Sequence, residues 1–190
     1  MALLVDRDKS CLLVIDVQEC FLQKLPADER APLVARIAWL VRVARELGIP
    51  VVAMAEDIVH QGLPVPELVS VLPGVVHDKR VFGLAGQPDI LAEVERTGRN
   101  EMILTGLETD VCVAQSALGL LDEGLRVVVV EDAVASPGAA HAAGIERMRR
   151  AGAVGVLTKQ LHYEWMRTVR RSREFEAAHP GLVQPPGVEL

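Results

Sequence analysis

The chain has 190 residues, of which 50% are hydrophobic and only 3% aromatic, and its 20 Lys and Arg are outnumbered by 26 Asp and Glu. This length suits one folded domain, which we expect to span residues 1–190 with residues 172–190 as a C-terminal extension. The net charge of −6 argues against nucleic acid as a partner.

The cysteines and the apolar runs exclude further classes. Three cysteines with no CxxC spacing argue against a disulfide framework and against a thiolate zinc site. No apolar run approaches the roughly 20 residues of a membrane span. The first residues also lack the basic and then apolar pattern of a signal peptide. We therefore expect a cytoplasmic protein that does not bind a membrane.

Short apolar runs alternate with longer amphipathic stretches along the chain. We expect strands at residues 11–16, 50–55, 75–79, 101–106, 126–132 and 153–157. We expect helices at residues 27–47, 89–97, 110–123, 139–151 and 160–169, a loop over 56–73, and an irregular tail over 179–190. This repeated βα pattern predicts an α/β fold: a doubly wound, mainly parallel six-stranded sheet with helices on both faces.

Polar residues follow several of the predicted strands. In such sheets, ligands bind beyond the carboxyl ends of the strands. Asp16 ends the first strand, Glu56 and Asp57 follow the second, and Lys79 ends the third. Each has a common structural explanation when taken alone, as a capping carboxylate or a surface charge.

Cys112 is the candidate nucleophile. It falls in the first turn of the helix predicted after the fourth strand, where the helix dipole and free N–H groups favour a thiolate and lower the thiol pKa. The same N–H groups can stabilise an oxyanion. Cys11, inside a strand, and Cys20 fit the commoner role of small buried hydrophobes. Asp16, Lys79 and Cys112 together supply a base, a cation and a nucleophile, as acyl transfer requires.

Three segments carry a family resemblance: VIDVQECF at 14–21, HDKRVFGLAG at 77–86 and ILTGLETDVCV at 103–113. In this order the chain resembles the isochorismatase-like superfamily, specifically its cysteine hydrolase branch, over roughly residues 10–167. The resemblance implies that Asp16 is the general base, that Lys79 orients Asp16 and the substrate, and that Cys112 forms a thioester.

The resemblance also implies positions around these three residues. The backbone amides of Glu108 and Cys112 would form the oxyanion hole, and the Leu107–Glu108 peptide bond would be cis. Phe21 and Leu107 would line the substrate pocket. Gln18 would brace a loop rather than contact the substrate.

A nucleophilic cysteine in this family implies hydrolysis of a C–N bond in a small amide, carbamoyl or ureide substrate. Two alternatives remain open: a vinyl ether hydrolase of the isochorismatase type with Cys112 as a bystander, and a non-catalytic oligomeric binding protein. We expect a homo-oligomer and no cofactor. Asp57, His60 and His77 occupy the region where related nicotinamidases bind a metal, but their spacing does not match, so we expect no metal.

Overall fold

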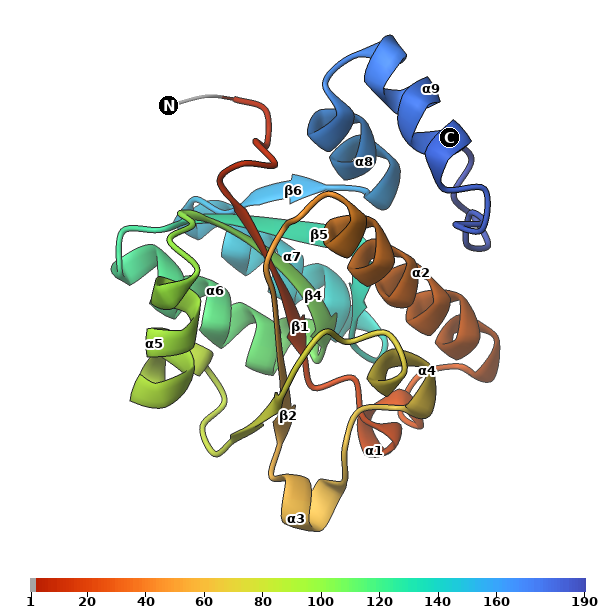
Figure 1. Ribbon diagram of the computed structural model, residues 1–190. Helices are drawn as coiled ribbons and strands as arrows, with labels where there is room; N and C mark the ends of the chain where they lie inside the picture. The colour runs from red at the N-terminus through yellow and green to blue at the C-terminus, as the bar shows by residue number, and fades with distance from the viewer. Residues whose placement is uncertain (1–2) are drawn as a thin grey trace.

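The structure is a computed structural model that describes residues 3–190. Its centre is a parallel sheet with the strand order β3-β2-β1-β4-β5-β6 (Figure 1). The strands are β1 (Ser10–Ile15), β2 (Val51–Glu56), β3 (Val76–Lys79), β4 (Glu101–Leu107), β5 (Arg126–Ala135) and β6 (Val154–Val156). This confirms the α/β class and the six-stranded parallel sheet predicted from the sequence.

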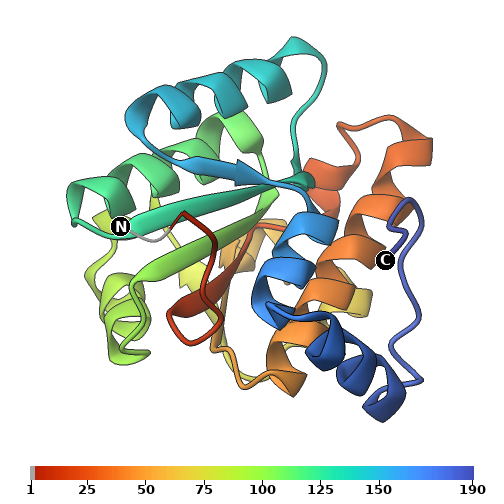
Figure 2. The same ribbon diagram turned by 90° about the horizontal axis from the view of Figure 1, so that it is seen from above.

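Helices cover both faces of the sheet (Figure 2). One face packs against α2 (Ala27–Glu46) and α8 (Thr158–Met166), whose core residues include Ile37 and Trp165. The other face packs against α5 (Pro88–Arg96), α6 (Ala114–Asp122) and α7 (Ala139–Ala151). Every residue of β1 and β4 is buried, which explains why these strands are continuous apolar runs instead of alternating ones.

The carboxyl ends of the strands carry several short helical turns. These are α1 (Glu19–Leu22), α3 (Ile58–Gln61), α4 (Pro66–Val69), a 3₁₀ turn at Leu84–Gly86 and a π turn at Thr109–Val113. The sequence predicted a loop over 56–73, but α3 and α4 interrupt this segment. The helix predicted to start at residue 110 begins as the π turn, and its regular α part starts at Ala114.

The C-terminal part also differs from expectation. Residues Val169–Ala178 form α9, which the sequence did not predict, and the irregular tail follows it. The tail lies along α2: the Trp39 indole donates to the Leu182 carbonyl at 3.5 Å, and Val188 is buried. Within residues 3–190, no helix combines the length and apolar character needed to cross a membrane.

Candidate active site

The site lies where the strand order changes direction. β1 is hydrogen-bonded to β2 on one side and to β4 on the other, so the helices that follow β1 and β4 leave toward opposite faces. A crevice at the carboxyl ends of these two strands is the usual ligand position in such sheets. Asp16 directly follows β1, and Cys112 lies in the π turn that follows β4.

Asp16 is held in an uncommon backbone conformation. Its φ is +50°, a region that aspartate enters more readily than most residues. Its backbone N–H donates to the Met54 carbonyl at 3.1 Å, and its own carbonyl accepts from the Gln18 N–H at 2.8 Å. The side chain is fully buried.

Lys79 is the cation of the site. It ends β3 and is fully buried. Its Nζ lies 2.9 Å from Asp16 Oδ2 and donates to the Val81 carbonyl at 2.8 Å. A buried lysine retains its charge only beside such partners. The structure therefore brings together the base and the cation that the sequence predicted.

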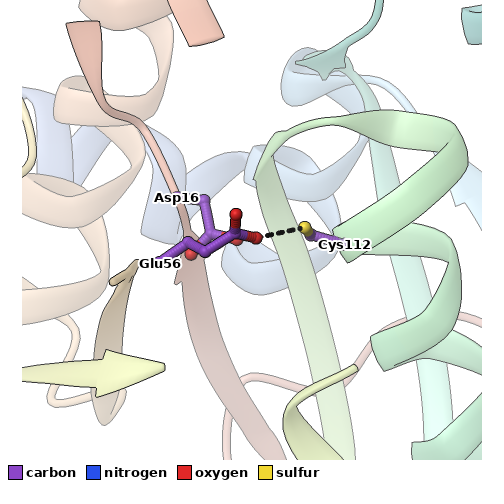
Figure 3. Close-up of side chains that lie close together, drawn as sticks. All are labelled: Asp16, Glu56 and Cys112. Atoms are coloured by element: carbon purple, nitrogen blue, oxygen red, sulfur yellow. Dashed lines mark hydrogen bonds between the residues drawn. The ribbon is translucent and has the colours of Figure 1, made fainter. Parts of the chain in front are cut away.

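Glu56 joins Asp16, Lys79 and Cys112 as the fourth member of a side-chain cluster. No role was expected for Glu56 from the sequence. It ends β2, in register with Lys79, and its Oε2 lies 3.6 Å from Lys79 Nζ. The Cys112 thiol donates to the same Oε2 at 3.3 Å (Figure 3). The only sequence signal was its place after a strand, which Asp57 shares.

Gln18 fixes the backbone of Glu56. Its Nε2 donates to the carbonyls of Glu56 at 2.8 Å and Gly62 at 2.7 Å, and its Oε1 accepts from the Glu56 N–H at 2.8 Å. Gln18 braces this loop, as the resemblance implied. The clamp uses only the backbone of Glu56, so the carboxylate is free to face the thiol.

The surroundings of Cys112 favour the neutral thiol, contrary to the sequence expectation of a lowered pKa. Burial raises the pKa of Cys112 well above its ordinary value, and the Asp16 carboxylate raises it further, while Lys79 opposes both. The expectation rested on the helix start, whereas burial of the thiol and its contact with Glu56 arise only in the folded chain. A neutral thiol needs a base to become a nucleophile.

Asp16 has the properties of that base. Burial raises the pKa of Asp16 to about 6, against the opposing effect of the Lys79 ammonium. Within residues 3–190, Asp16 Oδ1 accepts no hydrogen bond. The sulfur of Cys112 lies within 4.8 Å of an Asp16 carboxylate oxygen. A carboxylate of raised basicity with a free oxygen is therefore close to the thiol.

The other two cysteines have structural positions. Burial raises the pKa of Cys11 to about 12 inside β1, and burial also raises the pKa of Cys20 in α1. Cys11 belongs to the core and Cys20 packs against it, which agrees with their interpretation as packing residues.

The segment before Cys112 has the geometry that the resemblance implied. The Leu107–Glu108 peptide bond is cis. The Glu108 side chain pairs with Lys24 at 3.1 Å, and Lys24 lies 4.8 Å from the centre of the Phe21 ring. Phe21 is thus near this segment, whereas the Leu107 side chain is fully buried in the core on the α2 face.

His141 contacts the same segment from α7. Its Nδ1 lies 3.0 Å from Thr109 Oγ1, and Ser136 donates to Asp110 Oδ1 at 2.6 Å. The side chain of His141 therefore bridges α7 to the turn that carries Cys112.

Two of the candidate metal residues of the sequence, Asp57 and His60, contact each other. His60 lies 2.8 Å from Asp57, and Arg80 pairs with Asp57 at the same distance. Asp16, Glu56 and Cys112 form a second group with metal-ligand donors, and the Lys79 ammonium lies beside both of its carboxylates. The absence of a metal remains a prediction.

A model of the isochorismatase domain matches residues 10–160. The chain belongs to the isochorismatase family. Among curated members, the secreted isochorismatase effector Isc1 of Phytophthora sojae is 35% identical, covering 76% of this chain and 70% of its own. Isochorismatase domain-containing protein 2 of Bos taurus is 33% identical, covering 76% and 69%.

Solved structures of the isochorismatase family share the fold. YcaC from Pseudomonas aeruginosa, solved with hexane-2,5-diol and covalent acrylamide, has a TM-score of 0.84 at 27% identity, over 96% of this chain and 93% of its own. YcaC from Escherichia coli, described as an octameric hydrolase of unknown specificity, has a TM-score of 0.80 at 21% identity, over 96% and 99%. The chain is accordingly an isochorismatase-family hydrolase.

Proposed function

We propose that this hydrolase cleaves a C–N bond of a small amide, carbamoyl or ureide substrate through a thioester on Cys112. The observation that supports this most is the convergence of a buried thiol, a buried carboxylate and a buried ammonium at one strand switch point. The base and the cation are 2.9 Å apart. Burying such charges is costly, so an apolar core alone gives no reason for them.

Asp16 acts as the general base in this proposal. It takes the proton of the Cys112 thiol as the sulfur attacks the substrate carbonyl, and later gives that proton to the leaving nitrogen. The basicity of Asp16, with its pKa raised to about 6, suits both directions of transfer near neutral pH. Lys79 holds Asp16 in place and offsets its charge.

The backbone amides of Glu108 and Cys112 are the proposed oxyanion donors. Preorganised N–H groups aimed at the developing charge are a large source of rate enhancement in acyl transfer. Water then hydrolyses the thioester and regenerates the thiol. We include Phe21 and Leu107 in the proposed pocket on the resemblance; Phe21 is the better supported because it contacts Lys24, which pairs with Glu108.

We also propose that the chain self-associates. The support is the octameric description of the E. coli YcaC structure, which has the same fold. The proposal does not specify the number of subunits.

A substrate panel tests the function. Small primary amides, carbamoyl compounds and ureides are assayed for released ammonia or amine, with isochorismate in parallel. We expect turnover of C–N substrates by the wild type and a loss of about 10³-fold or more in Cys112→Ala. Isochorismate turnover by Cys112→Ala near the wild-type rate would contradict the proposal and favour ether hydrolysis. No turnover, together with a Cys112 reactivity that is the same in the wild type and in Asp16→Asn, would favour a binding protein.

A further inference from the structure

The cluster contains one carboxylate more than the proposed chemistry uses. Counted as ionised, Asp16 and Glu56 carry two negative charges against the single ammonium of Lys79. The ammonium lies closer to Asp16, at 2.9 Å, than to Glu56, at 3.6 Å. Glu56 is therefore the less compensated acceptor of the pair.

The thiol proton of Cys112 is directed to Glu56 in the resting site. The Sγ–Oε2 distance is 3.3 Å, and Figure 3 shows the carboxylate of Glu56 facing the sulfur. Asp16 Oδ1 meanwhile accepts no hydrogen bond from the described residues. The thiol thus has two carboxylates within reach, and it donates to the one that does not serve as the base.

Glu56 is also the member of the cluster that an entering molecule meets. Its side chain is 20% exposed, whereas those of Lys79 and Asp16 are fully buried, and Cys112 is 3% exposed. Among these four side chains, the Glu56 carboxylate is therefore the most accessible to a molecule from solvent. Its Oε2 can accept hydrogen bonds but, when ionised, cannot donate one.

We propose that Glu56 selects uncharged substrates that carry an N–H on the scissile nitrogen, by accepting that N–H at Oε2 in place of the Cys112 thiol. The proposal rests on the function proposed above and adds a substrate class to it: molecules containing C(=O)–NH₂ or C(=O)–NH–. Anionic substrates and esters present an acceptor or a negative charge to Glu56 and are disfavoured. This would also disfavour isochorismate, which carries carboxylates.

The exchange of donors prepares the chemical step. Once the substrate N–H donates to Glu56 Oε2, the thiol turns toward Asp16. The thiol proton is transferred to the Asp16 carboxylate as the S–C bond forms. The C–N bond then breaks, the proton moves from Asp16 to the nitrogen, and ammonia or an amine leaves. Water completes the hydrolysis, so Glu56 neither gains nor loses a proton.

Two thiol-reactive probes of nearly equal shape test this selection. N-methylacrylamide has an N–H where methyl acrylate has an oxygen, and both add the S–H of a cysteine across their C=C bond. Labelling of the Cys112 peptide is followed by mass spectrometry, and each rate is divided by the rate of the same probe with glutathione. We expect the wild type to prefer the amide probe by about tenfold or more after this correction.

Glu56→Gln supplies the variant, because it retains the size of the side chain and the backbone clamp by Gln18. Its amide can donate to an ester, so we expect the preference to fall by about fivefold or more. The matched control is Glu67→Gln, an exposed acid in α4, which should retain the wild-type preference. Equal corrected rates for the two probes in the wild type would overturn the inference, even if Glu56→Gln failed to fold.

Asp16→Asn separates this inference from the proposed function. If Asp16 is the base, this variant slows the labelling of Cys112 by both probes to a similar extent. Labelling that is indifferent to Asp16→Asn contradicts the proposed function. If labelling is slowed by Asp16→Asn but the corrected rates of the amide and ester probes are equal, only the role of Glu56 is contradicted.

Discussion

At the scale of single residues, the site is governed by burial of charge. Asp16 and Lys79 could be selected from the sequence because each ends a predicted strand, where parallel sheets bind ligands, and Cys112 because it lies in the first turn of the helix predicted after the fourth strand. Glu56 could not be separated from Asp57 in this way, since the direction of each side chain depends on the strand register and on the Gln18 clamp. The raised pKa of the thiol was missed because it arises first from burial in the folded chain and then from the Asp16 carboxylate.

The raised pKa of Asp16 predicts an acidic limit to activity. The base must be ionised to accept the thiol proton, so the rate should fall as the pH drops below about 6, by about tenfold for each further pH unit. The measurement is kcat/KM, or the labelling rate of Cys112, between pH 4.5 and 8. Asp16→Asn should remove this acidic limb of the pH–rate profile. A limb near pH 4, the range of an ordinary carboxyl group, contradicts the role given to burial.

At the scale of elements, apolar runs predicted the six strands, and helical periodicity predicted α2, α5, α6, α7 and α8, because those features are local. The short turns α1, α3 and α4 were not predicted because they are stabilised by contacts across the sheet edge, such as the Gln18 bond to Gly62. The π turn at Thr109–Val113 was likewise read as ordinary helix, because a π turn has no pattern in the sequence distinct from that of an α-helix.

The close contact of α7 with this turn gives a prediction. A Cβ at Gly144 would lie 2.8 Å from the Asp110 backbone, so Gly144→Ala should push α7 away from the turn that carries Cys112. We expect a loss of about 1–3 kcal/mol in the free energy of unfolding and slower labelling of Cys112. Urea denaturation and the labelling assay measure the two effects. Gly74→Ala is the control, since no atom lies within 4 Å of its added Cβ.

At the scale of the whole molecule, the C-terminal segment was the least predictable part. Its composition, rich in proline and glycine, suggested an irregular extension, and the residues after Ala178 are indeed irregular. Composition gave no sign of the bonds that tie this tail to α2, namely those from Trp39 to Leu182 and from Arg36 to Pro186 at 3.3 Å. These are long-range contacts, which local sequence does not encode.

Removal of residues 179–190 should therefore destabilise the protein. The deletion uncovers Trp39 and loses the burial of Val188, so we expect the free energy of unfolding to fall by about 1–3 kcal/mol. Urea denaturation provides the measurement. Val183→Ser, at a tail residue that is 79% exposed, should leave it nearly unchanged. An unaltered urea midpoint of unfolding after the deletion would show that packing of the tail contributes nothing to stability.

The most direct test of the proposed function is to trap the thioester intermediate on Cys112. A substrate from the C–N panel is mixed with the enzyme, quenched in acid within one turnover, and the protein is analysed by intact mass and peptide mapping. We expect an added acyl group on the Cys112 peptide, absent in Cys112→Ala and strongly reduced in Asp16→Asn. Turnover without any adduct on Cys112, retained in Cys112→Ala, would contradict it.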